Sequence, residues 1–192
     1  MGYSVDDFTS RIAKHGLASP NKFRIEFNKL PVSDPDRLLN FMAESVDIAG
    51  RQIQSTMNLT YGLRREIAYG APTYNPLSVT FLCTGEMKEK KMLDKWNNLC
   101  VDASTGFDVA YYEKYIGTMI VYTLDKDGRT ETYKQTFEEV WPKSVQSINL
   151  NHSTQNATAR VTVEFTYAYW TTAETHTTSA GATNHQIPTG VG

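Results

Sequence analysis

The residues best suited to bind a metal or attack a substrate are few in this sequence. The four histidines are His15, His152, His176 and His185. No two of them stand at i, i+4, and none has a cysteine at the spacing of a zinc site. Cys83 ends an apolar run with strand periodicity and Cys100 ends one with helical periodicity, so we interpret both as buried, reduced thiols. We therefore predict no metal site and no nucleophilic cysteine.

Neighbouring carboxylates give no sign of catalysis either. Glu138 with Glu139, and Asp125 with Asp127, fall in a predicted β-hairpin, where acidic side chains are usually solvated rather than paired for acid–base work. The sequence contains no GxGxxG and no GxxxxGK[ST] phosphate loop. We predict that the chain is not an enzyme and binds no cofactor.

Composition limits the partners of the chain. Its 192 residues, 40% hydrophobic and 21% charged, are enough for one well-filled core. The formal charge is -2, and no stripe of Lys and Arg alternates with aromatic residues, which argues against specific nucleic-acid binding. No segment approaches the roughly 20 apolar residues of a membrane span. We expect no membrane partner and production in a cytoplasm.

The elements that would position any site are mostly strands. Apolar and polar residues alternate, as in half-buried strands, over 22–30, 77–83, 117–125, 130–137, 145–151 and 159–170. Asp127-Gly128 is a hairpin turn signal between two of them, and Trp141-Pro142 predicts an interruption of the strand ladder. The pattern favours a mainly β fold, a β-sandwich or barrel with one covering helix.

Three segments have helical spacing. Ser4 predicts the cap of a short helix that ends near Leu17, and one or two turns are expected within 34–44. The clearest helix covers 86–101. Its predicted buried stripe is Met92, Trp96, Leu99 and Cys100, with the charged residues, Glu89 among them, around the rest.

The segment ARVTVEFTYAYW, residues 159–170, alternates so regularly that it predicts a single strand with two different faces. The apolar face consists of Val161, Val163, Phe165, Tyr167 and Tyr169. The polar face consists of Arg160, Thr162, Glu164 and Thr166. Such a strand suits a sandwich with one wet side and equally the wall of a water-filled channel.

Two further segments differ from a compact sheet. Gly50, Gly62 and Gly70 break a weak alternation, which predicts short strands or a long protruding hairpin. After Trp170 the composition turns to Thr, Ala, Ser, Gly, His and Asn, too polar to offset an ordering cost of about 1–2 kcal/mol per residue. We expect a β-domain over 1–170 and a polar extension over 171–192, which a neighbouring subunit would have to hold if it is ordered.

Three patches resemble the tail tube proteins of contractile-tailed bacteriophages, a family related to type VI secretion and pyocin tube proteins. The patches are VDDFTSRIAKHGLASPNKFRIEF, RREIAYGAPTYNPLSVTF, and the final set of Trp141-Pro142, Ile148, Leu150 and Tyr169-Trp170. The likeness runs from about Asp6 to Trp170. An insertion over 34–41 and the extension after Trp170 depart from the family's shorter members.

The resemblance implies a structural protein of the virion tail. Family members form hexameric rings in which strands of all subunits join into one barrel around a lumen. The rings stack into a tube inside a contractile sheath, between baseplate and tail terminator proteins, and DNA passes through the lumen without specific binding. Closing a sheet across subunits would also protect its edge strands.

Protruding segments are the expected contacts between subunits or rings. The candidates are Phe8, Arg51, Tyr61, Arg64, Arg65, Tyr69 and Tyr74. Arg64 and Arg65 suit either an intersubunit ion pair or a solvated hairpin face. The polar face of Arg160, Thr162, Glu164 and Thr166 is expected to meet the lumen or an adjoining subunit.

Two alternatives stay open at this point. One keeps the fold and changes the partners: a baseplate protein that starts the tube, or the tube of another contractile injection machine. The other is a monomeric ligand-binding β-barrel, which requires a large apolar interior pocket.

Overall fold

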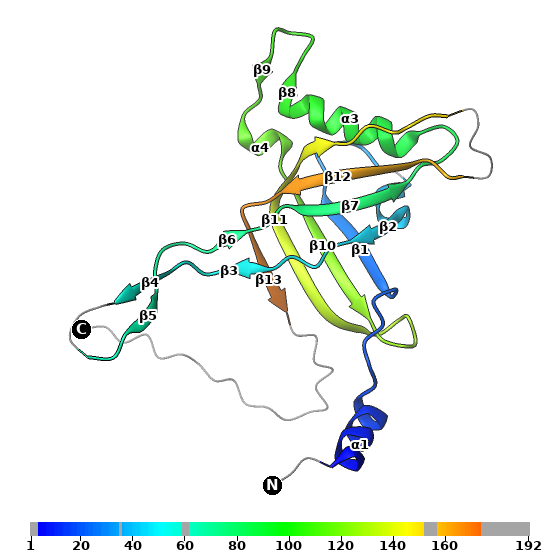
Figure 1. The fold of residues 1–192 in the computed structure, drawn as a ribbon. Helices are drawn as coiled ribbons and strands as arrows, with labels where there is room; N and C mark the ends of the chain where they lie inside the picture. Colours follow the sequence, from blue (N-terminus) through cyan, green and yellow to red (C-terminus); the bar gives the residue numbers. More distant parts are fainter. Residues whose placement is uncertain (1–3, 35, 59–61, 152–156, 174–192) are drawn as a thin grey trace, which may run out of the picture.

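The computed structural model describes residues 4–34, 36–58, 62–151 and 157–173. Its centre is one long strand, β11 (Glu131–Val145), which belongs to two groups of strands. The first half-sheet contains β1 (Phe23–Lys29), β10 (Gly117–Leu124), the beginning of β11, and β13 (Tyr169–Ala173). The second half-sheet contains the end of β11, β12 (Arg160–Thr166), β7 (Leu77–Leu82) and β2 (Ala43–Val46). All pairs are antiparallel, and the two half-sheets cross in Figure 1.

The change of direction within β11 has a visible backbone cause. Glu139 has a φ of 58°, and the register with β12 shifts between Pro142 and Ser144. The predicted interruption at Trp141-Pro142 is therefore a shift of register within β11 and does not end the strand, because proline is accommodated at this irregularity. The predicted strand over 145–151 is also absent: β11 ends at Val145, and 146–150 are not in a strand.

The segment 159–170 forms two strands instead of the predicted one. β12 ends at Thr166, and Ala168 donates its backbone N–H to Glu138 O at the bend before β13. The first four residues predicted on the apolar face are buried, but Tyr169 is 46% exposed. The alternation continues through the bend while the chain passes from one half-sheet to the other, so the last residue of the pattern faces a different environment.

The core lies between the two half-sheets. Ile25, Met119, Val121 and Phe137 come from the first half-sheet, whereas the second gives Leu77, Val79, Phe81, Val161, Val163 and Phe165. The helix α3 (Lys88–Cys100) adds Trp96, whose ring lies 5.7 Å from that of Phe165 and 6.1 Å from that of Phe27. Trp96 Nε1 donates to Tyr115 O at 2.7 Å, which satisfies its buried polar atom. The expected mainly β architecture with one covering helix is confirmed.

The buried stripe of α3 differs from the predicted one. Trp96 and Cys100 are buried as expected, but Leu93 is buried too, and Leu99 is 44% exposed. Glu89, predicted at the surface, is fully buried because its Oε2 accepts from both the backbone N–H and the hydroxyl of Thr84. Cys83 is only half-buried.

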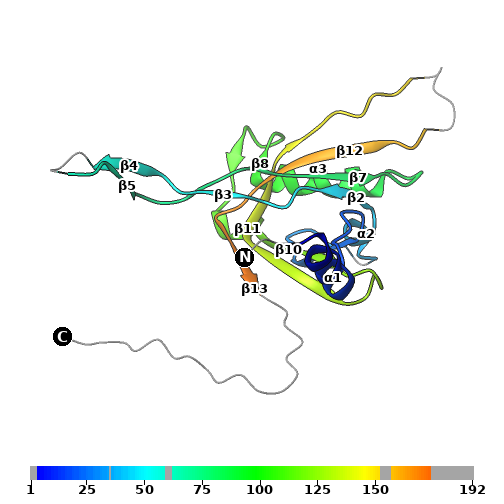
Figure 2. The ribbon, with the colours of Figure 1, turned by 60° about the horizontal axis from the view of Figure 1, so that its bottom comes forward.

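The remaining elements are α1 (Val5–His15), α2 (Leu38–Phe41), β3 (Arg51–Gln52), β4 (Ser55–Asn58), β5 (Arg65–Ala68), β6 (Thr73–Tyr74), β8 (Val101–Asp102), β9 (Asp108–Val109) and α4 (Tyr112–Tyr115). Of these, α2 and α4 pack on this body, through the buried Leu39 and through the hydrogen bond between Trp96 Nε1 and Tyr115 O, whereas α1, the strands β3 to β6 and the β8–β9 hairpin project from it (Figures 1 and 2). Ser4 caps α1 and Gly16 ends it, as predicted, and α2 is the short helix expected within 34–44. β13 continues to Ala173, and the rest of the predicted C-terminal extension, 174–192, lies outside the described residues.

Candidate assembly surfaces

The arm, residues 50–75, is the largest projection from the body (Figure 2). Two short two-stranded ladders build it, β3 with β6 and β4 with β5, so the predicted protruding hairpin is confirmed. Its exposed large apolar residues are Ile53, Met57, Leu63, Ile67 and Tyr69. A two-stranded ladder is marginally stable alone, and exposed apolar side chains of this number mark an interaction surface.

The base of the arm is fixed to the body by aromatic contacts. The ring of Tyr74 lies 5.8 Å from that of Tyr167 and 6.5 Å from that of Trp170, and the Arg51 guanidinium lies 5.6 Å from the Trp170 ring. Tyr167 Oη donates to Asn75 O at 2.7 Å, and burial raises the pKa of this tyrosine. The predicted contact residues Arg51 and Tyr74 thus lie at the anchored end of the arm.

The outer part of the arm holds most of the other predicted contact residues. Arg64, Arg65 and Tyr69 are all exposed there. Ser55 donates its hydroxyl to the Glu66 carboxylate across the β4–β5 ladder. Tyr61 lies outside the described residues.

The helix α1 is a second projection, with Phe8 on its exposed apolar side. Ser4 accepts from the Asp7 N–H at 3.1 Å and the Asp7 carboxylate accepts from the Ser4 N–H, which forms a capping box. Val5 is 80% exposed and Phe8 65% exposed, although both would be buried if α1 packed on its own core.

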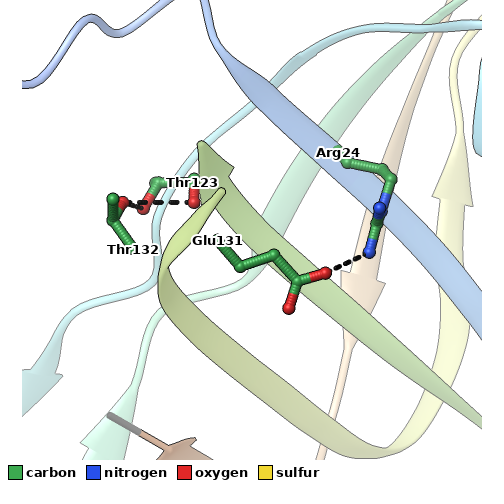
Figure 3. Close-up of polar contacts among 4 residues, drawn as sticks. All are labelled: Arg24, Thr123, Glu131 and Thr132. Carbon is green, nitrogen blue, oxygen red and sulfur yellow. Dashed lines mark hydrogen bonds and ion pairs between the residues drawn. The ribbon is translucent and has the colours of Figure 1, made fainter. Parts of the chain in front are cut away.

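The outer face of the first half-sheet carries a polar layer with charges of both signs, the Arg24 layer, which consists of Arg24, Glu26, Glu131, Lys134 and Glu138. Arg24 pairs there with Glu131 at 2.5 Å (Figure 3). The hydroxyls of Thr123 and Thr132 pair at 3.0 Å at the hairpin end of the same strands, where Thr123 continues the alternation of the buried Met119 and Val121 on the core side. The Arg24 guanidinium also lies 4.5 Å from the centre of the Tyr122 ring, which Lys134 approaches to 5.6 Å. Burial beneath these cations, followed by the negative charge of Glu26, raises the pKa of Tyr122.

The first half-sheet ends in two edge strands. β1 pairs only with β10, and β13 only with β11, among the described residues. On β1 the Phe27 N–H faces away from β10 and donates to Asn40 Oδ1 of α2. Apart from this bond, the backbone groups along the outer side of each edge strand can pair with a strand of another chain.

The polar face of β12 lies on the second half-sheet. Arg160 pairs with Glu44 of β2 at 2.6 Å, which lowers the pKa of Glu44. The hydroxyls of Thr162 and Thr80 lie 3.1 Å apart, while Glu164 stands opposite Ser78 and Thr166 opposite Trp141. The four predicted residues therefore share one strand but lie on a different half-sheet from the Arg24 layer.

Sequence reasoning missed the hairpin of β8 and β9. It predicted a helix up to Val101 and a loop over 102–112, yet this region carries Val101, Phe107, Val109 and Tyr111, the last three of which are more than 70% exposed. The sequence signal that could have indicated this hairpin was the number of large apolar residues in a segment that is otherwise rich in Asp, Ser and Thr. The hairpin adds a third exposed apolar surface.

Chemistry-bearing residues do not gather within the described part of the chain. No group of three or more His, Cys, Asp or Glu residues there could hold a metal ion. Cys83 and Cys100 are both free, and burial raises the pKa of Cys100 to about 11, so its thiol stays protonated near neutral pH. No described helix has the length and apolar content needed to cross a bilayer.

Edge strands and exposed apolar projections define the class of this protein as a structural assembly subunit. Residues 16–173 match the model of a family described as phage tail tube protein, so the chain belongs to the phage tail tube protein family. Its role is therefore structural, in a tail tube, as the sequence resemblance predicted.

Solved structures share the fold. A chain in the anti-feeding prophage (AFP) baseplate aligns with a TM-score of 0.61 and 10% identity, over 82% of this chain and 96% of that chain. A chain in the AFP tube-terminating cap gives a TM-score of 0.61 and 10% identity, over 82% and 91%. A chain in the sheath–tube complex of PVC, an extracellular contractile injection system, gives a TM-score of 0.58 and 12% identity, over 90% and 99%. No curated protein matches the sequence significantly.

Proposed function

We propose that the chain forms hexameric rings that stack into the hollow tube of a phage tail, inside a contractile sheath. The observation that best supports this proposal is the first half-sheet, whose four strands have a polar outer face and two edge strands, β1 and β13. Pairing β13 of one subunit with β1 of the next would leave no edge in the first half-sheet around the ring. Membership in the tail tube family supports this arrangement.

The Arg24 layer then faces the lumen. Its charges of both signs suit a conduit for DNA, because each uncompensated cation would bind a phosphate and retard passage. Arg160, Thr162, Glu164 and Thr166 lie on the other half-sheet and would meet an adjoining subunit. The arm would reach the neighbouring subunit or ring with its exposed apolar residues.

The remaining partners follow from the same proposal. The sheath protein would surround the tube, and baseplate and tail terminator proteins would bind its two ends. The protein would be assembled in the host bacterial cytoplasm and remain in the virion tail. Its function needs neither catalysis nor a cofactor.

Electron microscopy of the purified protein at increasing concentration tests the proposal. Rings or hollow tubes are expected, and a protein that stays monomeric at high concentration would contradict it. Two proline variants sharpen the test. Thr171→Pro and Thr172→Pro each remove one N–H of β13, and neighbouring N–H groups point to opposite sides of a strand. One variant should lose the rings while its fold remains stable, and the other should weaken pairing with β11.

Tube measurements also test the lumen assignment. The double variant Glu131→Lys/Glu138→Lys adds positive charge to the Arg24 layer, so its tubes should retain DNA in a salt-dependent way. Unaltered tubes and a Glu131→Asp/Glu138→Asp control, which keeps the negative charges, should release DNA at low salt. Equal retention by all three would contradict the placement of this face.

A second candidate is a tube-like protein at one end of the tail. Residues 174–192 favour it, because they extend beyond the part that matches the family. A main tube protein should form long tubes alone, whereas an end protein should stop at single rings.

A further inference from the structure

The helix α1 and the groove beside α3 lie at opposite ends of the β1–β10 pair. At one end Lys22 O accepts from the Leu124 N–H, and Gly16 approaches Lys126. At the other end, Gly117 lies against the backbone of Lys29 and the ring of Trp96. Figure 1 shows α1 and α3 separated by the length of the strands.

The groove has an apolar floor and charged residues along it. Val32, Met92 and Leu99 form its apolar part between the end of β1 and α3, and Lys95 and Asp102 also line it. Val32 and Met92 are half-buried and Leu99 is 44% exposed, so this apolar surface is incompletely covered by its own subunit.

The exposed side of α1 matches the apolar part of this groove. Val5, Phe8 and Ile12 recur at helical spacing and form an apolar stripe. Arg11 lies roughly 90° around the helix from the centre of this stripe, nearer to it than Asp7 and Lys14. Phe8 and Arg11 are three residues apart, as are Leu99 and Asp102 of the groove, so a helix lying parallel to α3 with Phe8 at Leu99 would bring Arg11 towards the opposite charge of Asp102.

The helix is held away from the groove of its own subunit. Gly16 ends α1 beside Lys126, and the Lys22 ammonium donates to Lys126 O, which fixes the connection 16–22 at the β10–β11 turn. A surface at one end that fits a surface at the other end makes a head-to-tail contact, and such a contact repeats indefinitely along a filament.

We propose that α1 of one subunit binds the groove of Val32, Met92 and Leu99 on a second copy of this chain in the next ring. Phe8 packs against Leu99, and Arg11 of α1 approaches Asp102. This contact rests on the proposed stacking of rings, and it assigns the receiving surface for the N-terminal helix.

Paired cysteine substitutions test the contact directly. In assembled tubes, Phe8→Cys/Leu99→Cys should give a ladder of disulfide-linked chains under mild oxidation. The control Ser10→Cys/Leu99→Cys places the new thiol on the opposite face of α1 and keeps Cys83 and Cys100 unchanged, as the test variant does. It should give few disulfide-linked chains. Tubes that form normally without a ladder, or equal ladders in both variants, would overturn the contact while leaving the tube proposal intact.

A single substitution separates the contact from ring formation. Phe8→Ser should still form rings but need at least about tenfold more protein to form tubes, since the side chain lies at the centre of the proposed contact. The control Ala13→Ser changes another exposed face of α1 and should behave like the unaltered protein. Unchanged tube formation by Phe8→Ser would overturn the contact. If the unaltered protein forms no rings, both the proposed function and this contact are contradicted. If it forms rings that do not stack into tubes, the end-of-tail role is favoured and the contact is overturned.

Discussion

The body of the protein and its projections use similar apolar residues for different purposes. Phe165 in the core is completely buried, whereas Leu63 in the arm is 84% exposed and Phe107 in the β8–β9 hairpin is 71% exposed. Burial of an apolar side chain by its own chain stabilises the single subunit, whereas burial by another chain stabilises the assembly. We therefore expect the body to fold by itself and the projections to bury their apolar surface against other chains.

Substitutions in the body and in the arm should differ most in their effect on stability. Phe165 packs against Phe27, Phe81 and Trp96, so Phe165→Ala should lower the free energy of unfolding by about 3–5 kcal/mol. Leu63→Ala in the arm should change it by less than about 0.5 kcal/mol. Urea unfolding followed by tryptophan fluorescence measures both. Similar losses would show that the arm belongs to the folding core.

Two glycines sharpen the same comparison at the level of the backbone. A Cβ on Gly117 would lie 2.3 Å from Lys29 O and 3.3 Å from the Trp96 ring. Gly117→Ala should therefore cost about 2 kcal/mol, because β1, β10 and α3 must move apart. The matched control is Gly50→Ala at the start of the arm, where nothing lies within 4 Å and little change is expected. Thermal melting of the two variants measures this difference in stability. Equal melting temperatures would contradict the close contact of Gly117 with Lys29 and Trp96.

The buried Cys100 makes the stability of the body depend on pH. Because burial raises the pKa of Cys100 to about 11 from an ordinary value of 9.0, the folded state favours the neutral thiol. As the pH rises, the Cys100 thiol loses its proton in the unfolded chain before it does so in the folded protein. The contribution of this thiol to the free energy of unfolding is therefore complete below about pH 9 and is lost between about pH 9 and pH 11.

Thiol labelling near neutral pH checks the same thiol. The half-buried Cys83 should react faster in the Cys100→Ser variant than Cys100 reacts in the Cys83→Ser variant, and urea should abolish the difference. Rapid labelling of Cys100 in the folded protein would refute its protection.

Charge reversal in the arm should have the smallest effect on the fold. Arg64 and Arg65 are exposed, so Arg64→Glu/Arg65→Glu should leave the melting temperature nearly unchanged but impair stacking of rings. Arg64→Lys/Arg65→Lys keeps the charge and serves as the control. Tube length by electron microscopy gives the result, and an unfolded double variant would contradict the assignment of these residues to an exposed arm.

Local pattern was sufficient where one chain segment meets one environment. The alternation of β1, β7 and β12 correctly indicated their buried residues, and Ser4 with Asp7 correctly indicated the start of α1. The family resemblance also came from ordered local patches. The presence of a protruding arm followed from Gly50, Gly62 and Gly70, which interrupt any continuous strand.

Only the tertiary structure decided how these elements divide into two half-sheets. The sequence on both sides of Glu139 and Pro142 has the composition of a strand, so no local pattern revealed that β11 passes from one half-sheet to the other. The bend after Thr166 is likewise set by pairing with β11, far away in the sequence. Glu89 is buried where the Thr84 N–H and hydroxyl donate to it, and the groove of Val32, Met92 and Leu99 exists because the end of β1 lies beside α3. Sequence periodicity determines which side of an element avoids water, whereas the neighbour that covers that side depends on contacts between segments distant in the chain.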